Sequence, residues 1–159
     1  MTAGLPLRID PERGRLRVGE SRYLLIRPET LAPVVGAPDP AVAELLREGG
    51  RAGGRLAAAA VRDRGPADRE AAARILAFGA RIGWGVFEVE WSDEGARVTL
   101  RNSPFAEAAR GRAGGPVCHL VCGVLEGIWE VALGRRARFV ETRCAALGAP
   151  ACRFEEETS

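Results

Sequence analysis

FVETRCAALGAPACRFEEE, residues 139–157, holds two segments typical of β-strands around the turn-forming sequence AALGAP. With the residues just before it, the stretch predicts an antiparallel hairpin formed by RARFVETRC and ACRFEEE. Cys144 and Cys152 flank the turn, and Glu141 precedes the first cysteine by three residues. Three interpretations are open at this point: a metal site, a disulfide, or a hairpin that carries reduced thiols.

The length and composition of the chain predict one globular domain over residues 1–159. Of the 159 residues, 47% are hydrophobic and 28% are charged, as in ordinary soluble proteins. No apolar run approaches the roughly 18 residues of a membrane span, and the first residues lack the layout of a secretion signal. We therefore expect a cytoplasmic protein without membrane contact. Thiols stay reduced there, which disfavours a disulfide between Cys144 and Cys152.

The charges of the chain argue against nucleic-acid binding. All 23 basic residues are arginine, 21 acidic residues offset them, and the formal net charge is +2. The arginines are scattered among the acids, whereas a phosphate-binding protein usually concentrates its basic residues on one element. We therefore expect no direct contact with nucleic acid.

The N-terminal part predicts short strands followed by a long helix. PLRID, RLRVG and RYLLIR, within residues 6–27, have strand composition and are separated by turn signals. A helix is predicted from Asp39-Pro40 through residue 63, since aspartate is a good N-cap and proline suits the first turn. Four glycines between residues 49 and 54 each cost about 1 kcal/mol relative to alanine. Either the helix breaks there, or another backbone packs closely against it, within one subunit or between two.

The central part predicts a helix and a hairpin. The helix spans residues 67–83 and presents one apolar face, made by Ala72, Ile75, Leu76, Gly79 and Ile82. WGVFEVEW and ARVTLRN, joined by SDEG, form an antiparallel hairpin. Val86 and Val89 lie on opposite faces of its first strand, so this strand is either covered on both sides or bulged.

The C-terminal part predicts the most apolar helix of the chain. Residues 103–115 are interpreted as a polar, mobile connection, and the helix is expected to run from Pro116 to Gly134. The alternation of helices and antiparallel hairpins predicts an α+β fold, with several helices packed against a sheet of hairpins.

Chain lengths bring ligand-type residues to one end of this helix. From Cys118 to Gly134 the helix rises about 24 Å at about 1.5 Å per residue, and the strand from Gly134 to Glu141 returns about 23 Å. An antiparallel strand therefore places Glu141 level with Cys118, and the hairpin adds Cys144 and Cys152. Glu141 and Cys144 differ by three positions, so both can face one ion only if the chain turns or bulges between them.

Three thiolates and one carboxylate suit a tetrahedral Zn²⁺ ion, and with every position filled by protein the site would be structural. The helix N-terminus is expected to favour the thiolate of Cys118. Two alternatives stay open from the residues alone: the cysteines are simply buried apolar side chains, or Cys122, one turn after Cys118, replaces Glu141. His119 points about 100° away around the helix and is interpreted as structural, because no nucleophile is paired with it.

GWGVFEVEW, PVC, FVETRC and GAPACRF together resemble the 4-vinyl reductase domain, over residues 83–157. This domain occurs alone in prokaryotic proteins and as the sensor of aromatic-responsive transcription activators, which carry a zinc site of similar order and spacing. The resemblance implies that Cys118, Glu141, Cys144 and Cys152 bind a structural zinc ion.

The resemblance also implies a function. In the sensor relatives similar elements enclose a small aromatic effector, so we expect a non-enzymatic sensor with an apolar pocket for a hydrophobic or aromatic ligand. The aromatic side chains nearest the predicted hairpin and last helix are the candidate lining residues: Trp84, Phe87, Trp91, Phe105 and Trp129.

Two other functions are implied by the same family. One is an enzyme or accessory protein in vinyl reduction of tetrapyrroles, although the chain contains no nucleotide, flavin or haem motif. The other is a scaffold subunit, because the fold resembles small subunits of vesicle-tethering complexes. A homodimer is expected under each reading. The chain has neither the ATPase motor nor the helix-turn-helix of the activators, so any transcriptional output requires a protein partner.

Overall fold

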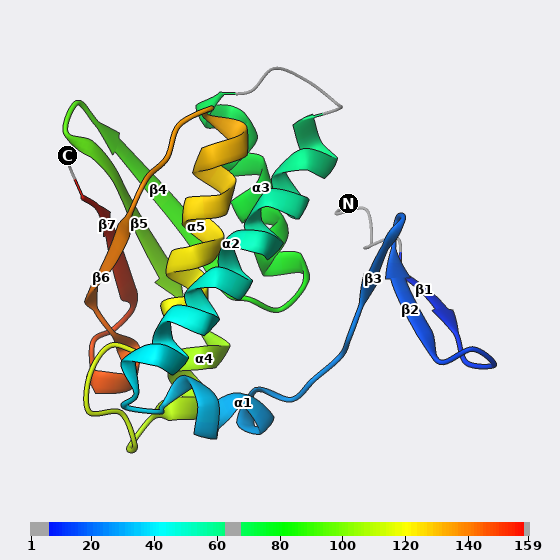
Figure 1. Ribbon diagram of the computed structural model, residues 1–159, viewed down its shortest axis with the longest axis horizontal. Helices are drawn as coiled ribbons and strands as arrows, with labels where there is room; N and C mark the ends of the chain where they lie inside the picture. The colour runs from blue at the N-terminus through cyan, green and yellow to red at the C-terminus, as the bar shows by residue number, and fades with distance from the viewer. Residues whose placement is uncertain (1–6, 63–67, 158–159) are drawn as a thin grey trace.

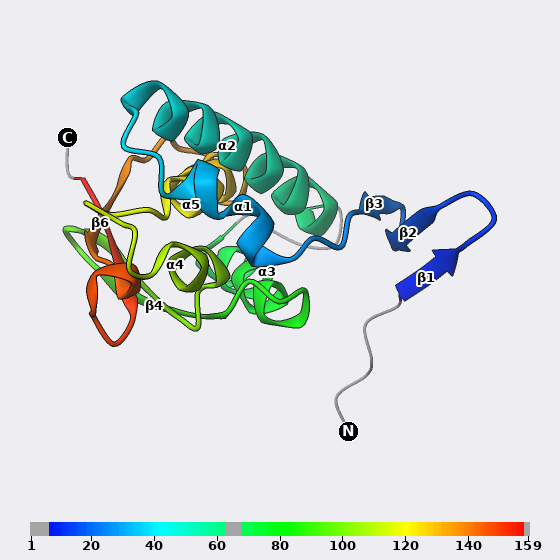
Figure 2. The same ribbon diagram turned by 90° about the horizontal axis from the view of Figure 1, so that it is seen from below.

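The structure, a computed structural model, describes residues 7–62 and 68–157. A four-stranded antiparallel sheet and the helices form the body of the molecule, and a small three-stranded sheet at the N-terminus stands apart from it (Figures 1 and 2). Within the body, helix α5 (His119–Ala132) lies between the four-stranded sheet and helix α2 (Pro40–Arg62). The predicted α+β fold is confirmed.

The sheet of the body is built from two hairpins in the order β4-β5-β7-β6. Strand β4 (Val86–Ser92) pairs with β5 (Gly95–Arg101) in an uninterrupted register, and its residues alternate between exposed and half-buried. The expectation that β4 is covered on both sides or bulged is therefore wrong, because Val86 simply faces solvent. The second hairpin pairs β6 (Phe139–Arg143) with β7 (Cys152–Glu156), as predicted.

Helix α5 is the centre of the hydrophobic core. Leu125, Ile128 and Trp129 are at most 1% exposed, because the sheet covers one side of the helix and α2 the other. The helix begins at His119 rather than at the predicted Pro116, and Cys118 is its N-cap residue. Gly134, just beyond the C-terminus, has a φ of 67°, a left-handed conformation that glycine adopts without strain.

Helices α2 and α5 approach so closely that only glycine fits at four positions: Gly50, Gly54, Gly123 and Gly127. A Cβ atom on any of them would overlap a backbone carbonyl oxygen of the facing helix. Helix α2 is continuous through residue 62, so the predicted break does not occur, and the close backbone contact lies within one subunit. Asp39 accepts a hydrogen bond from the Ala41 amide at 2.8 Å, as expected of a helix start.

Two short helices escaped prediction. Helix α1 (Pro28–Val35) follows the N-terminal sheet, and α4 (Pro104–Ala109) lies in the segment that was interpreted as a polar, mobile connection. That interpretation is wrong because Ser103 caps α4, accepting from the Ala106 amide at 3.3 Å, and the helix buries Phe105.

Helix α3 (Arg69–Arg81) buries most of its predicted apolar face, including Ile75 and Leu76. The predicted helix ends at residues 63 and 67 lie outside the described residues.

The N-terminal sheet contains β1 (Leu7–Asp10), β2 (Arg15–Val18) and β3 (Ser21–Tyr23) in that order, all antiparallel. The first two strands agree with prediction, whereas the third ends at Tyr23 instead of residue 27. From there residues 24–27 run as a linker without regular structure to α1 (Figure 1). No described helix is both long and apolar enough to cross a membrane.

Candidate metal centre

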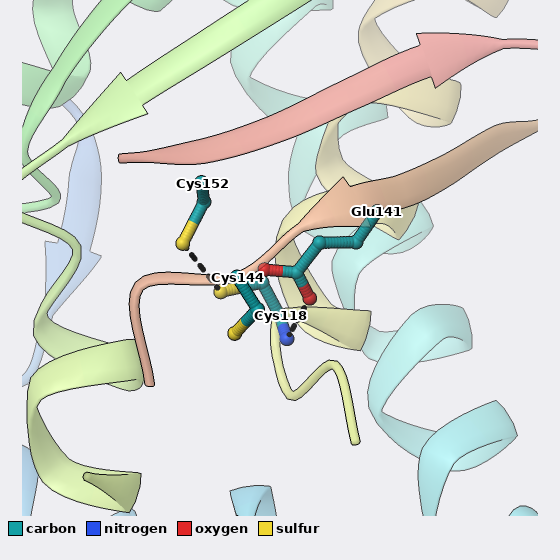
Figure 3. A group of neighbouring side chains, drawn as sticks. All are labelled: Cys118, Glu141, Cys144 and Cys152. Carbon is teal, nitrogen blue, oxygen red and sulfur yellow. Dashed lines mark hydrogen bonds between the residues drawn. The ribbon is translucent and has the colours of Figure 1, made fainter. Parts of the chain in front are cut away.

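Four ligand-type side chains from three parts of the body converge beneath the N-terminus of α5 (Figure 3). Their sulfur and carboxylate atoms lie within 4.8 Å of one another, and all four residues are buried: Cys118, Glu141, Cys144 and Cys152. Cys118 precedes α5, Glu141 lies in β6, Cys144 follows that strand, and Cys152 begins β7. The structure thus brings together the four residues that the sequence singled out.

A bulge in β6 turns the first two hairpin ligands toward the same point. Glu141 pairs with Phe154, but Arg143 pairs with Arg153, so two steps along β6 match one step along β7. This register shift is the irregularity that the three-residue spacing of Glu141 and Cys144 requires. The predicted bulge is confirmed.

A short turn then carries the chain from Cys144 to Cys152. The 3-10 helix η1 (Ala145–Leu147) follows Cys144, whose carbonyl oxygen accepts from the Leu147 amide at 3.1 Å. Gly148 ends this turn with a φ of 95°. The turn reverses the chain, so that Cys152 returns beside Cys118, with 3.6 Å between their sulfur atoms.

Glu141 also closes the N-terminus of α5. Its Oε2 atom accepts a hydrogen bond from the Cys118 amide at 2.9 Å, while the Cys118 side chain makes no capping bond. The carboxylate therefore satisfies one of the amides that a helix start leaves unpaired. The bond also confirms the chain-length prediction that β6 returns to the level of Cys118.

The sulfur atoms are surrounded by hydrogen-bond donors. The Ala145 amide donates to Cys152 Sγ at 3.3 Å, and the Ser103 hydroxyl lies 3.6 Å from Cys118 Sγ. All four cysteines are free, and the 3.6 Å between Cys118 Sγ and Cys152 Sγ greatly exceeds the about 2.05 Å of a disulfide. Such donors orient and stabilise thiolates in metal sites.

Without a metal ion, the three thiols of the cluster share one negative charge. Hydrogen bonds from Cys118 and Cys152 lower the pKa of Cys144 strongly. The same hydrogen bonds, together with burial, raise the pKa of Cys118 well above its usual value. For Cys152, a hydrogen bond from Cys118 acts downward, but donation to Cys144 and burial outweigh it and raise the pKa to about 12.

The expectation that the helix N-terminus makes Cys118 the thiolate is therefore wrong for the metal-free protein. Its neighbouring thiols outweigh the helix dipole, and Cys144 carries the charge instead. Burial also raises the pKa of Glu141 to about 7.

This donor set fits a divalent zinc ion. Glu141 Oε1 is buried and makes no hydrogen bond of ordinary geometry to the described residues. Three sulfur atoms and one carboxylate oxygen are ligands that Zn²⁺ takes in tetrahedral sites, and a cation among them would remove the cost of burying adjacent negative charges. Four protein ligands leave no position for a catalytic water, so the arrangement is of the structural kind.

The two rival residues lie outside the cluster. Cys122 is 2% exposed, and its Sγ atom is not among the four convergent ligand atoms; burial raises its pKa to about 12. His119 is half-buried and lines a surface cavity of about 510 Å³, together with Arg47 and Arg138. Burial and the nearby Arg47 guanidinium lower the pKa of His119, so the imidazole is neutral at pH 7.

The five candidate pocket residues pack mainly against one another or the core. Trp91 stacks on Trp129 with their ring centroids 5.2 Å apart, and Trp84 meets Phe105 edge-on at 5.1 Å. Phe87 lies against Gly79 of α3. None of the five lines either of the surface cavities of about 570 and 510 Å³ described for residues 7–62 and 68–157.

Sequence reasoning missed a buried ion cluster that anchors the start of β6. Arg47 of α2 donates to Glu126 Oε1 at 2.6 Å and also to the carbonyl oxygen of Phe139. Arg51 donates to Glu126 Oε2 at 2.8 Å, and the Phe139 amide donates to Glu126 Oε1 at 3.0 Å. The buried glutamate in an apolar helix was the only sequence signal for this cluster, and its partners lie about 75 residues away along the chain.

Residues 96–158 match the vinyl-4-reductase (V-4-R) domain. The segment contains all four clustered residues and confirms the resemblance to the 4-vinyl reductase domain that the sequence motifs indicated. No curated protein matches the chain significantly.

Solved structures extend this family likeness beyond the matched segment, although their low identity supports the fold alone. The phenol-responsive sensory domain of the transcription activator PoxR has a TM-score of 0.80 and 18% identity, covering 96% of this chain and 84% of that one. A vinyl-4-reductase family protein from Methanocaldococcus jannaschii gives 0.56 and 19%, covering 72% and 68%. Subunit 3 of a trafficking protein particle complex from Naegleria fowleri, covalently bound to palmitic acid, gives 0.57 and 16%, covering 83% and 95%.

Proposed function

We propose that this protein is a sensor module that binds a small hydrophobic or aromatic molecule and is held together by a structural zinc ion. The observation that carries the proposal is the likeness to a phenol-responsive sensory domain over 96% of the chain. The described residues suggest no catalytic arrangement: the only histidine lacks a paired nucleophile, and the clustered cysteines fill one another's surroundings.

Cys118, Glu141, Cys144 and Cys152 would hold the zinc ion, which would supply a cross-link between the start of α5 and the β6–β7 hairpin. Metal analysis of untagged protein tests this part. We expect one zinc ion per chain and three thiols that become reactive only after chelation. Cys144→Ser should abolish zinc binding, whereas Cys122→Ser, which removes a buried thiol outside the cluster, should retain it. A protein without metal whose four thiols all react freely would contradict the proposal.

The ligand site would lie among α3, α5 and the inner face of the sheet, where Trp84, Phe87, Trp91, Phe105 and Trp129 gather. Because these rings already pack on one another, a ligand must separate some of them, and binding should therefore change tryptophan fluorescence. Thermal shift and fluorescence with phenols, hydrocarbons and fatty acids test this. If no compound of these three classes changes either signal, the sensor proposal fails.

A second candidate is an enzyme or accessory protein in tetrapyrrole vinyl reduction, which the likeness to a vinyl-4-reductase family protein favours. Binding of a vinyl tetrapyrrole that shifts its absorption bands would support this function. The likeness to a trafficking-complex subunit supports a third reading, in which the protein is a scaffold for assembly. Loss of function from surface substitutions alone would favour that reading.

We further propose that the module acts in the cytoplasm as a homodimer and passes its signal to a protein partner, without direct contact with nucleic acid or membrane. Its interspersed charges and net charge of +2 support this. Mass measurement in solution, with and without ligand, tests the dimer.

A further inference from the structure

The N-terminal sheet has one entirely apolar face. Directly paired residues of antiparallel strands point to the same side of a sheet. Leu7 pairs with Val18, and Ile9 pairs with Leu16, which in turn pairs with Tyr23. These five side chains therefore form a single face, which we call the apolar face of the N-terminal sheet.

The opposite face of this sheet is charged. Arg8, Arg17 and Arg22 form one row across the three strands, and Asp10 pairs with Arg15. Three like charges side by side destabilise a sheet rather than hold it together. The polar face is thus suited to solvent, and the stability of the sheet must come from whatever covers its apolar face.

Nothing in the described chain covers the apolar face fully. Ile9 is 67% exposed and Leu7 is 42% exposed, although both belong to that face. The apolar surface continues into the linker, where Leu24 and Leu25 are each 79% exposed. A hollow of about 570 Å³ is lined by Ile9, Leu25 and other residues of the sheet. Both views show the sheet standing away from the body (Figures 1 and 2).

A sheet of this size needs a covering element. Two- and three-stranded sheets become stable in water only when a hydrophobic face packs against something, commonly a helix. Contiguous exposed apolar surface in a soluble protein is also typical of an interaction site. The N-terminal sheet therefore indicates a missing partner surface.

A matching surface exists on the outer side of α2. Leu45 and Leu56 are 67% and 73% exposed, the two highest values among large apolar side chains of the described body. They are eleven residues apart, which places them about 16 Å along the helix and within about 20° of the same side. A four-residue strand is about 14 Å long, so the two surfaces agree in length. We call the stripe from Leu45 to Leu56 the outer face of α2.

We propose that two copies of this chain exchange their N-terminal sheets, so that the apolar face of each sheet lies on the outer face of α2 of the other copy. The inference deepens the homodimer of the proposed function and is independent of the zinc ion and of the ligand.

The area of the contact favours a reciprocal pair. A face of three strands and four residues measures about 14 by 14 Å, so one contact buries about 400 Å² on its two sides, less than stable interfaces need. A two-fold exchange doubles this area, and the exposed residues 24–26 extend it toward the roughly 1,200 Å² at which specific interfaces begin. Reciprocity therefore brings the contact to the size of a weak but specific dimer.

Charge at the rim agrees with this occupant. Residues 7–27 contain six arginines and three acidic residues, so the sheet and its linker carry a net positive charge. Glu44 and Glu48 are exposed on α2 beside Leu45. A sheet laid on this stripe would bring arginines near these carboxylates, which would orient the contact.

Analytical ultracentrifugation of the full chain over a range of concentrations tests the proposal first. We expect a monomer–dimer equilibrium whose Kd rises about a hundredfold or more in Leu56→Glu and in Ile9→Asp, because each change occurs twice per dimer. Val86→Glu is the matched control: Val86 is 38% exposed on β4, away from both surfaces, and this variant should dimerise like the parent. Unchanged circular dichroism would show that the variants remain folded.

Cross-linking identifies the contact itself. Chains carrying Ile9→Cys and chains carrying Leu56→Cys, tagged to different lengths, are mixed and oxidised, with the parent chain as control for native thiols. We expect a disulfide-linked species containing one chain of each kind.

Each other result overturns the assignment in a distinct way. A bond formed within single chains that carry both changes would mean that the sheet folds back on its own α2. Linkage of two Ile9→Cys chains to each other would mean that the sheets pack face to face. A dimer that resists Leu56→Glu and forms no mixed bond would preserve the homodimer but reject this interface, whereas a monomer at every concentration would reject both.

Discussion

The N-terminal sheet and the β6–β7 hairpin are both small antiparallel units, yet they are held in different ways. The hairpin is covered by α5, tied to it by the Cys118–Glu141 hydrogen bond and anchored by Glu126. The N-terminal sheet has an apolar face with Ile9 exposed and no comparable anchor among the described residues. Strand pattern therefore creates a local unit, but buried polar contacts and a covering helix decide whether one chain is enough to stabilise it.

Removal of the metal should break this difference most strongly. Structural zinc ions contribute on the order of 10 kcal/mol to folding in small sites, so chelation should lower the melting temperature by more than about 10 °C. Hydrogen exchange should show lost amide protection in β6 and β7, while β1–β3 change little. Equal protection in both regions before and after chelation would show that zinc does not distinguish them.

Loss of the buried carboxylate should have the next largest effect. Glu126→Gln leaves Arg47 buried without its counter-charge and weakens the anchor of Phe139, which we expect to destabilise the protein by about 3–5 kcal/mol in urea unfolding. Glu130→Gln removes a carboxylate from the more exposed pair with Arg55 and should cost less than about 1 kcal/mol. Similar losses in both variants would show that the buried cluster does not anchor β6.

The contact between α2 and α5 can be tested with a matched glycine pair. In Gly123→Ala the new methyl group overlaps the backbone of α2, and we expect a loss of about 3 kcal/mol. Gly53 is exposed and has no neighbour within 4 Å, so Gly53→Ala should stabilise the helix by about 1 kcal/mol. Opposite signs in chemical denaturation would confirm that only one side of α2 is closely packed; equal effects would contradict it.

The smallest expected effect is the pH dependence of the metal-free protein. Burial raises the folded-state pKa of Glu141 to about 7, above its ordinary value of 4.5, so the folded protein binds the proton more tightly. The stability that this group contributes is complete below pH 4.5 and falls as pH rises to about 7, by up to about 3 kcal/mol. Unfolding of chelated parent and Glu141→Gln at several pH values isolates this contribution, since the thiols are common to both. Parallel pH profiles would show that Glu141 does not titrate in this range.

Much of the body could be predicted because its signals are local or depend on chain length. Alternation marked both hairpins, and the rise of a helix against that of a strand placed Glu141 beside Cys118. The missed elements lacked such signals. Helix α1 is short and contains Pro33, and α4 has a polar sequence that hides the burial of Phe105.

The site was predicted in its membership but not in its charge distribution. The spacing of Glu141 and Cys144 required a bulge, and the structure has one. The thiolate was assigned to Cys118 from the helix dipole, because sequence spacing does not show how strongly neighbouring thiols compete for a proton. The pairing of Arg47 with Glu126 was equally invisible, since neither residue has a local partner that would predict it.

The glycine contact between α2 and α5 has a mechanical consequence. Side chains between two helices normally act as cushions that change rotamer when one helix shifts, but at Gly50, Gly54, Gly123 and Gly127 backbone lies directly against backbone. The two helices are therefore expected to move as one rigid rod-like unit. Any force applied to the outer face of α2 would be transmitted without slack to the start of α5, where Cys118 lies.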